Sequence, residues 1–278
     1  MDDTIRARVR LWLRAEQALG AGRFVHAGRR NASGVGAAEG GAAGARAPAE
    51  HAAPPPARAA SSAPQAPTLF AAAEGDLAAP AYSRQEKIAL LAELDAKHVK
   101  PCRKCVLCQQ RRTTVFGEGD VDAALFFIGE GPGEEEDRTG RPFVGRAGKK
   151  LDEMIAAMGL RREQVYIGNV VKCRPPGNRT PEPGEMATCV PYLIRQLEII
   201  RPKVIVLLGA TAVRGLLEIP AAVGSLRGQW RTWRGIKVMI TYHPAFLVRT
   251  PTLEARRAVW SDLQKVMAEL GLKNPRAR

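Results

Sequence analysis

The sequence predicts an α/β fold, a three-layer α/β/α sandwich around a central four-stranded parallel sheet, with a disordered N-terminal extension. Four short apolar runs have the length and flanking residues of buried strands, and helical patterns separate them. Alternating strands and helices are typical of a parallel sheet covered on both faces. The strand-like runs cover residues 125–128, 165–170, 204–208 and 238–241, and the helical patterns cover 146–158, 184–200, 209–217 and 252–270.

The N-terminal region differs in composition from the rest of the chain. From about residue 20 to residue 80 it consists mainly of Ala, Gly, Pro, Ser and Arg, which bury too little apolar area to offset the entropy lost on ordering. Residues 4–19 alone have the pattern of a short basic amphipathic helix. We therefore expect an appendage over residues 1–80 and a folded domain over 81–278. The first helix of that domain should run from Ser83 to about Lys97, with an apolar face of Ile88, Leu90, Leu91 and Leu94.

The charge of the chain favours a nucleic-acid partner. Lys and Arg number 42 against 28 Asp and Glu, a net charge of +14, and residues 1–80 hold only nine of the basic and seven of the acidic groups. The positive excess therefore belongs to the folded domain, where DNA or RNA binding is the usual reason and a solubility surface is the alternative. No apolar run approaches the roughly 20 residues of a membrane span, and the N-terminus lacks the apolar core of a secretory signal. We expect a cytoplasmic protein that does not enter the membrane.

The first predicted strand leads into a glycine-rich loop that marks a pocket. Six glycines lie between Gly129 and Gly148, among several carboxylates, three arginines and Phe143. Glycine permits sharp bends and close approach of a ligand. A phosphate cradle is one interpretation, but the loop lacks GxxxxGK[ST] and its acidic run would repel phosphate. A planar ligand stacked on Phe143 suits the residues better, and a solvated loop with Phe143 in the core is the alternative without a ligand.

Polar side chains also follow the other predicted strands. Glu130 and Gly131 follow the first strand, Asn169 ends the second, and His243 follows the last. In an open α/β sheet the ligand site lies beyond the carboxyl ends of the strands. A carboxylate, an amide and an imidazole are therefore expected on one rim, although each alone is more often a structural residue.

The five cysteines indicate a metal site. Cys102 and Cys105 form a C-x2-C pair typical of metal ligands, and Cys108 extends it to C-x2-C-x2-C. Cys173 and Cys189 supply a second pair, separated by one loop. An odd number in a reducing compartment argues against a disulfide framework. Four thiolates can hold either Zn²⁺ or a 4Fe-4S cluster, and spacing alone does not decide between them.

Several long motifs, in order, resemble those of family 4 uracil-DNA glycosylases, the iron-sulfur type of bacteria and archaea. They are GEGPGEEEDRTGRPFVGRAGKKLDEM, YIGNVVKCRPPGNRTPEP and YHPAFLVRTP, together with the cysteine spacing, and the resemblance covers about residues 85–270. It implies a 4Fe-4S cluster rather than zinc, with Cys102, Cys105, Cys173 and Cys189 as ligands. It also implies that Cys108 is not a ligand.

The resemblance implies a role for each residue of the pocket. Phe143 stacks on a flipped-out uracil, Asn169 reads its O4 and N3 edge, and His243 donates to O2 as charge develops on the leaving base. The carboxylates nearest the pocket, Glu130 and Glu136, orient water or offset the cationic sugar. Gly131 stands where other uracil glycosylases carry a water-positioning Asp, so the group that activates water stays open.

The same resemblance places the DNA backbone against two segments. One is the helix start from Gly145 to Gly148, which includes Arg146. The other runs from His243 to Arg249, where Phe246 or Leu247 inserts into the base stack at the place that the flipped-out uracil leaves. Ordinary core packing is an equal alternative for Leu247. Arg174 is expected to touch phosphate. The implied substrate is uracil-containing DNA, double- or single-stranded, bound by a monomer, and residues 1–80 would serve a repair or replication partner.

Competing functions remain at this point. They are a non-catalytic iron-sulfur protein that binds nucleic acid, a covalent uracil-DNA-binding relative, and a zinc-stabilised enzyme acting on nucleotide phosphates. The covalent relative carries a histidine-bearing basic loop after the second strand, and residues 174–183 contain no histidine. Turnover is therefore favoured, with hydrolysis of the N-glycosidic bond leaving an abasic site for base excision repair.

Overall fold

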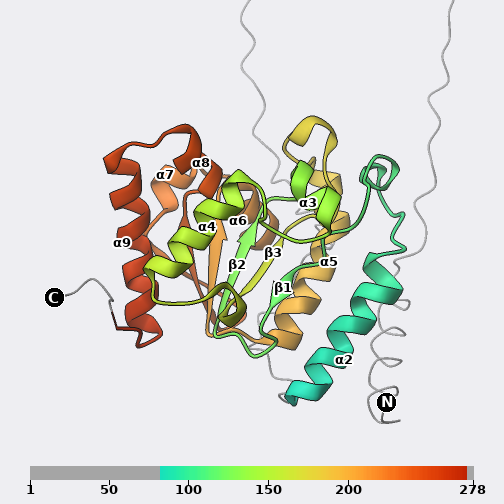
Figure 1. Cartoon of the computed structure of the whole chain (residues 1–278), viewed down its shortest axis with the longest axis horizontal. Coiled ribbons are helices and arrows are strands. Elements are labelled where there is room, and N and C mark those ends of the chain that lie inside the picture. Colours follow the sequence, from blue (N-terminus) through green and yellow to red (C-terminus); the bar gives the residue numbers. More distant parts are fainter. Residues whose placement is uncertain (1–81, 274–278) are drawn as a thin grey trace, which may run out of the picture. The chain divides into compact units, whose positions relative to one another are not determined.

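The computed structural model describes residues 82–273, which form an α/β fold as predicted (Figure 1). One six-stranded sheet has the order β1-β3-β2-β4-β6-β5. Its four central strands are parallel and are the four that the sequence predicts: β2 (Leu125–Gly129), β3 (Tyr166–Asn169), β4 (Val204–Leu208) and β6 (Ile236–Thr241). The expected helix over residues 4–19 and the linker that follows it lie outside the described residues.

The predicted number of strands was wrong, because an antiparallel strand is added at each edge. The short β1 (Glu118–Gly119) pairs with β3, and β5 (Trp230–Trp233) pairs with β6. Two residues ending in glycine give no periodic signal, and β5 is an exposed edge whose two middle residues are polar. Neither segment has the continuous apolar run that identifies a strand buried on both faces.

Helices cover both faces of the sheet (Figure 1). On one face α4 (Arg146–Ala157), α8 (Pro244–Arg249) and α9 (Leu253–Glu269) bury their apolar sides in a common core with alternate strand residues. On the other face lie α2 (Arg84–Leu94), α5 (Pro183–Ile200) and α6 (Ala210–Leu217). Short elements complete the description: α7 (Val223–Leu226), a π-helical turn (Asp95–Val99), and 3-10 helices at Val106–Gln109, Arg162–Gln164 and Pro176–Asn178.

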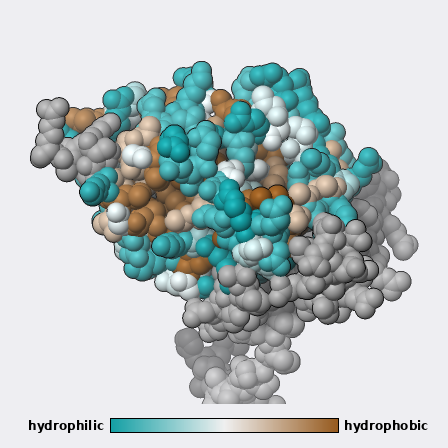
Figure 2. Space-filling model, turned by 60° about the horizontal axis from the view of Figure 1, so that its bottom comes forward, coloured by the Kyte–Doolittle hydropathy of each residue, from teal (hydrophilic) through white to brown (hydrophobic). Residues whose placement is uncertain are grey.

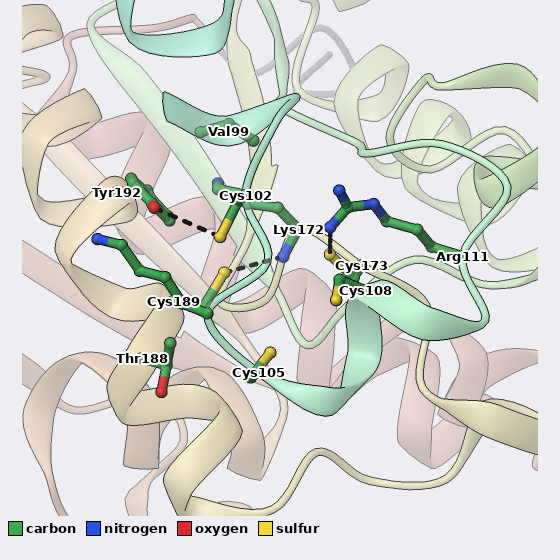
Figure 3. Close-up of a pocket in the computed structure, with 11 residues that line it drawn as sticks. Val99, Cys102, Cys105, Cys108, Arg111, Lys172, Cys173, Thr188, Cys189 and Tyr192 are labelled. Carbon is green, nitrogen blue, oxygen red and sulfur yellow. Dashed lines mark hydrogen bonds between the residues drawn. The ribbon is translucent and has the colours of Figure 1, made fainter. Parts of the chain in front are cut away.

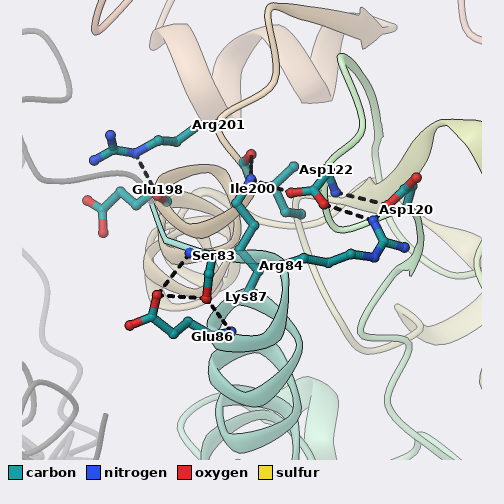
Figure 4. A network of polar contacts seen from close by, with 9 residues as sticks. All are labelled: Ser83, Arg84, Glu86, Lys87, Asp120, Asp122, Glu198, Ile200 and Arg201. Atoms are coloured by element: carbon teal, nitrogen blue, oxygen red, sulfur yellow. Dashed lines mark hydrogen bonds and ion pairs between the residues drawn. The ribbon is translucent and has the colours of Figure 1, made fainter. Parts of the chain in front are cut away.

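The first helix of the domain begins where predicted, and three of the four residues of its expected apolar face, Leu90, Leu91 and Leu94, are buried. Ser83 caps α2 with a complete capping box, as its sequence indicates. Ile88, expected in the apolar face, is 44% exposed, whereas Lys87 is buried. The Lys87 ammonium donates to Asp122 Oδ1 at 2.8 Å and to the Ile200 carbonyl at 3.1 Å, which fixes α2 to the end of α5 (Figure 4).

The glycine-rich loop contains a helix that its sequence did not reveal. α3 (Glu134–Thr139) begins after Gly133 and ends at Gly140, whose φ of 73° is the left-handed conformation favoured by glycine. The Glu136 carboxylate accepts a hydrogen bond from the Gly133 N–H at 3.1 Å and so caps the helix start. Six mostly charged residues have no apolar periodicity, and for this reason the segment was expected to be a loop.

Hydrophilic side chains cover most of the described surface on the face shown in Figure 2, and hydrophobic ones gather in smaller patches. Within residues 82–273 the large hydrophobic side chains that stay exposed are Ile88, Val106 and Leu253. No helix in this part of the chain has both the length and the apolar character needed to cross a membrane.

Candidate active site and cysteine-lined site

A cavity of about 480 Å³ opens at the carboxyl ends of the parallel strands. It contains residues from the loops after β2, β3, β4 and β6, in agreement with the position expected for an α/β sheet. Seven residues singled out from the sequence line it together: Glu130, Gly131, Glu136, Phe143, Asn169, His243 and Arg249. The fold therefore brings residues that are up to 119 positions apart into one pocket.

Asn169 presents an unused acceptor to this cavity. Its side chain is 1% exposed, and its buried Oδ1 has no hydrogen-bond partner among the described residues. The side chain lies directly over Gly129, where an added Cβ would stand 2.5 Å from Oδ1. A buried polar atom without a partner costs free energy, on the order of 1–3 kcal/mol. Such an atom at a cavity wall is available to accept a hydrogen bond from a donor of a bound ligand.

Phe143 forms an aromatic wall of the same cavity. Its ring is 5% exposed and lies over Gly129, with the His243 ring centroid 5.6 Å away. The backbone of Phe143 has a φ of 50°, the left-handed region that a bulky residue rarely adopts. Its carbonyl accepts a hydrogen bond from Arg162 at 3.1 Å and packs against Gly148, which hold this conformation. Strained backbone of this kind is common at functional sites.

His243 lies at the start of α8 and presents a neutral ring. Its Nδ1 accepts a hydrogen bond from the Ala245 N–H at 3.1 Å. The pKa of His243 is lowered to about 4, first by burial and second by the positive charge of Arg249, with Glu136 acting in the opposite sense. Because Nδ1 is an acceptor in a neutral imidazole, the proton is on Nε2. The pocket thus has one N–H donor from this ring.

The two candidate carboxylates differ in their contacts. Glu136 uses both oxygens within the protein: besides Gly133, it accepts hydrogen bonds from the N–H groups of Val144 and Gly145, both at 2.8 Å. It therefore holds the glycine-rich loop in shape. Among residues 82–273, Glu130 accepts a hydrogen bond only from the Thr211 hydroxyl, on one of its two oxygens. Of the two, Glu130 has the freer carboxylate at the cavity.

The remaining predicted DNA contacts lie around the pocket in different environments. Arg146 is exposed at the first residue of α4, and Arg174 donates to Asn178 Oδ1 at 2.8 Å and lies 3.6 Å from Glu134. Gly148 is buried, and a Cβ there would stand 2.0 Å from the Phe143 carbonyl oxygen. Leu247 is 5% exposed within the core on the α4 and α9 face. The structure gives Gly148 and Leu247 packing roles, and their contacts with DNA stay predictions.

A second site is lined by all five cysteines (Figure 3). Cys102, Cys105 and Cys108 come from the segment before β1, Cys173 follows β3, and Cys189 lies on α5. Three sulfurs accept hydrogen bonds: Cys173 from Arg111 at 3.0 Å, Cys189 from the Lys172 N–H at 3.2 Å, and Cys102 from the Tyr192 hydroxyl at 3.4 Å. Nothing bridges these sulfurs as a disulfide.

The thiols of this site lie in surroundings that disfavour bare thiolates. Burial raises the pKa of Cys189 to about 12 and also raises the pKa of Cys173 and of Cys105. A metal that replaces the proton removes this cost. In the part of the chain that the structure describes, no group of three or more His, Cys, Asp or Glu side chains has the arrangement of a single-ion site.

Comparison with known proteins identifies the family. The sequence profile of the uracil DNA glycosylase superfamily matches residues 116–264. A type-4 uracil-DNA glycosylase of Thermotoga maritima is 50% identical over 186 residues, which are 66% of this chain and 95% of the relative. The chain belongs to the type-4 uracil-DNA glycosylase family. Similar proteins of that name in Saccharolobus solfataricus and Archaeoglobus fulgidus are each 44% identical, over 65% and 64% of this chain and 87% and 93% of their own length.

The resemblance read from the sequence is thereby confirmed. The glycosylase superfamily profile includes the whole cavity and two of the cysteines, Cys173 and Cys189, but begins after Cys102 and Cys105. A type-5 uracil-DNA glycosylase of Pyrobaculum aerophilum is more distant, at 32% identity over 53% of this chain and 72% of the relative.

Three residues of this glycosylase-family site were missed by the sequence reasoning. Thr211 and Arg214 line the cavity from α6, and Lys172 lies between Asn169 and the cysteine-lined site. The only signal for Thr211 and Arg214 was their position shortly after the end of β4. Lys172 carried no signal of its own, because its contacts depend on α5, which is remote in sequence.

Proposed function

We propose that this chain excises uracil from DNA by hydrolysing the N-glycosidic bond, leaving an abasic site for base excision repair. The observation that carries the proposal is the buried Oδ1 of Asn169, which has no hydrogen-bond partner within residues 82–273 and lies beside an aromatic wall and a neutral imidazole donor. The names of the relatives at 44–50% identity support it, since each is a uracil-DNA glycosylase.

Asn169 and Phe143 would recognise the flipped-out base. Uracil has an N–H at N3 and a carbonyl at O4, and one amide can accept from the first and donate to the second. The unpartnered Oδ1 supplies the acceptor that this pairing needs. The ring of Phe143 offers a flat apolar surface on which a base stacks. Cytosine, with an acceptor at N3 and an amino group at C4, would meet the amide with the wrong pattern.

His243 would stabilise the base as it leaves. When the glycosidic bond breaks, the electron pair goes to uracil and negative charge gathers on O2. The Nε2–H of neutral His243 would donate to that oxygen, in a partly buried setting where such a hydrogen bond is stronger than in water. The hydrogen bond at Nδ1 fixes the ring before the reaction begins, so little reorganisation is needed.

Glu130 would face the sugar side of the reaction. One of its oxygens is held by Thr211 and the other has no partner in the described part of the chain. A carboxylate there can offset positive charge on the deoxyribose or orient the attacking water. Glu136, with both oxygens bound to backbone N–H groups, would act by holding the loop that carries Phe143.

Basic residues at the rim would bind the DNA backbone. Arg214 and Arg249 line the cavity and form no ion pair in residues 82–273, and Arg146 is exposed at the start of α4. Phosphate contacts position a duplex without reading its sequence. This arrangement is consistent with the net charge of +14.

Cys102, Cys105, Cys173 and Cys189 would hold a 4Fe-4S cluster. The fit is supported by the donor set: these thiols line one site with Cys108, and Arg111, Tyr192 and the Lys172 N–H donate hydrogen bonds to three of the sulfurs. Donors of this kind stabilise thiolate sulfur in iron-sulfur sites. When bound, the cluster would supply a structural cross-link between the segment before β1 and α5.

Iron content tests the ligand assignment. Cys173→Ala and Cys189→Ala should lose iron and the visible absorbance of the cluster, whereas Cys108→Ala should keep both, because four ligands close the cluster. An iron-free Cys108→Ala protein, or a Cys189→Ala protein with the parental iron content, would contradict it. Zinc in place of iron would overturn the choice of metal.

The wider setting follows from the same proposal. Five cysteines without a disulfide suit a reducing, cytoplasmic compartment. We infer that residues 81–278 act as a monomer on DNA and that residues 1–80 serve a repair or replication partner.

The test of the function is cleavage of a uracil-containing oligonucleotide after alkali, with the same oligonucleotide carrying thymine as control. Strand cleavage only at uracil supports the proposal. Protein that stays covalently attached to the DNA would indicate covalent capture. Binding without cleavage would indicate a non-catalytic protein.

A further inference from the structure

Lys172 is a buried cation that the proposed reaction does not use. It lies between the base-reading Asn169 and the cluster cysteine Cys173 and is 1% exposed. In the described part of the chain it forms no ion pair with a carboxylate. A buried ammonium costs considerable free energy unless its surroundings compensate it. Lys172 does not line the cavity, so the cost of burying it calls for an explanation other than contact with the base.

The ammonium of Lys172 is bound to the end of strand β3. Its Nζ donates to the main-chain carbonyl of Asn169 at 3.0 Å and to Gln196 Oε1 at 2.6 Å. Gln196 is fully buried on α5, and its Nε2 donates to the Phe116 carbonyl at 2.9 Å. The side chain of Lys172 therefore links the backbone of Asn169, at the end of β3, to Gln196 on helix α5.

The main chain of Lys172 contacts the cysteine-lined site. Its N–H donates to Cys189 Sγ at 3.2 Å (Figure 3). Its carbonyl accepts a hydrogen bond from the Val115 N–H at 2.8 Å. One residue thus touches a cluster thiol with its peptide and the base-reading strand end with its side chain. With the proposed cluster bound, its thiolate ligands would place negative charge beside the ammonium, in addition to the attraction of the Asp95 carboxylate.

We propose that Lys172 is a positioning residue for uracil recognition: it fixes the strand end that carries Asn169 and couples it to the cysteine-lined site. The proposal rests on the function proposed above. The side-chain amide of Asn169 has little room to move, because the backbone of Gly129 lies directly beneath it. A small shift of the strand end would therefore misalign the amide with the N3 and O4 edge of the base.

The test compares Lys172→Met with a matched control, Lys87→Met. Lys87 is also a buried lysine that donates to a main-chain carbonyl, that of Ile200 at the end of α5 (Figure 4). It lies on α2 and is not among the residues that line the cavity. The probes are duplexes that contain 2′-fluoro-2′-deoxyuridine or 2′-fluoro-2′-deoxycytidine at one position, which bind without being cleaved. The ratio of the two affinities reports how well the amide reads the base.

We expect Lys172→Met to lower the uracil-over-cytosine ratio roughly tenfold, the effect of one misaligned hydrogen bond, with unchanged iron per chain. Lys87→Met should keep the parental ratio even if it lowers thermal stability. A parental ratio in Lys172→Met, or an equal loss in Lys87→Met, would overturn the proposal. A parent protein that fails to excise uracil would instead overturn the proposed function.

A second variant keeps the proposal testable if Lys172→Met does not fold or loses iron. Gln196→Met leaves Lys172 and every cysteine in place but removes the second acceptor of the ammonium. It should lower the same ratio in the same direction by a smaller factor. A folded Gln196→Met protein with the parental ratio would refute the role of the network.

Discussion

Replacing His243 by alanine separates its role in catalysis from its role in the fold. The ring has two uses: Nδ1 accepts the Ala245 N–H at the start of α8, and Nε2 carries the proton that would reach uracil O2. Removing a donor aimed at an oxyanion lowers the rate of the chemical step about 10²- to 10³-fold, or about 2.7–4 kcal/mol. Removing a helix cap costs about 1 kcal/mol of stability.

His243→Asn is the matched control for the cap. Its side-chain oxygen can still accept a hydrogen bond at the start of α8, but asparagine is too short to place a donor where Nε2 stands. Both variants should excise uracil more slowly. Only His243→Ala should lose the helix cap, with a fall in melting temperature of roughly 2–4 °C for a domain of this size.

The assay is single-turnover excision from a uracil duplex with enzyme in excess, together with the affinity for a non-cleavable uracil duplex. Because the hydrogen bond forms chiefly with charge that develops in the transition state, the rate should fall far more than the affinity. A parental rate in both variants would refute the role of His243. A His243→Asn protein that excises normally beside a slow His243→Ala protein would show that the cap alone matters.

Three further outcomes are expected. Because the pKa of His243 is lowered to about 4, the excision rate should stay constant from neutral pH down to about pH 5 and fall only as the ring is protonated near pH 4. A rate that rises on acidification would mean that the charged ring is the active form. Arg214→Gln should reduce the slope of log affinity against log salt concentration by about 0.9, the value of one phosphate contact on duplex DNA. The control Arg257→Gln, at an exposed position of α9, should keep the parental slope, and a parental slope in Arg214→Gln would remove Arg214 from the interface. Deleting residues 1–80 should leave excision nearly unchanged, because the first proposed site residue is Cys102 and all others follow it. A truncated protein without a thermal transition would refute the domain boundary.

The central fold was predictable because its strands are buried on both faces and their apolar runs are continuous. The edge strands β1 and β5 and the helix α3 were not predictable, because short polar or glycine-containing segments take their structure from neighbours remote in sequence. Propensity over so few residues carries little information.

The site was predictable to the extent that strand ends determine it. Asn169 and His243 each follow a strand, and the topology of a parallel sheet was enough to bring them together. Contacts made by side chains could not be predicted. No sequence pattern indicates that both oxygens of Glu136 accept hydrogen bonds from backbone N–H groups, or that Lys172 donates a hydrogen bond to α5.

The base released from DNA tests the central claim most directly. The products of the parent protein and of Asn169→Leu, which has a side chain of similar size without hydrogen-bonding groups, would be identified by mass after incubation with a uracil duplex. The parent should release free uracil in an amount equal to the abasic sites formed, and Asn169→Leu should release it at least about 100-fold more slowly, because two hydrogen bonds to the base are lost. Equal release by the two proteins, or no uracil from the parent, would contradict the assignment of this cavity as a uracil-excising site.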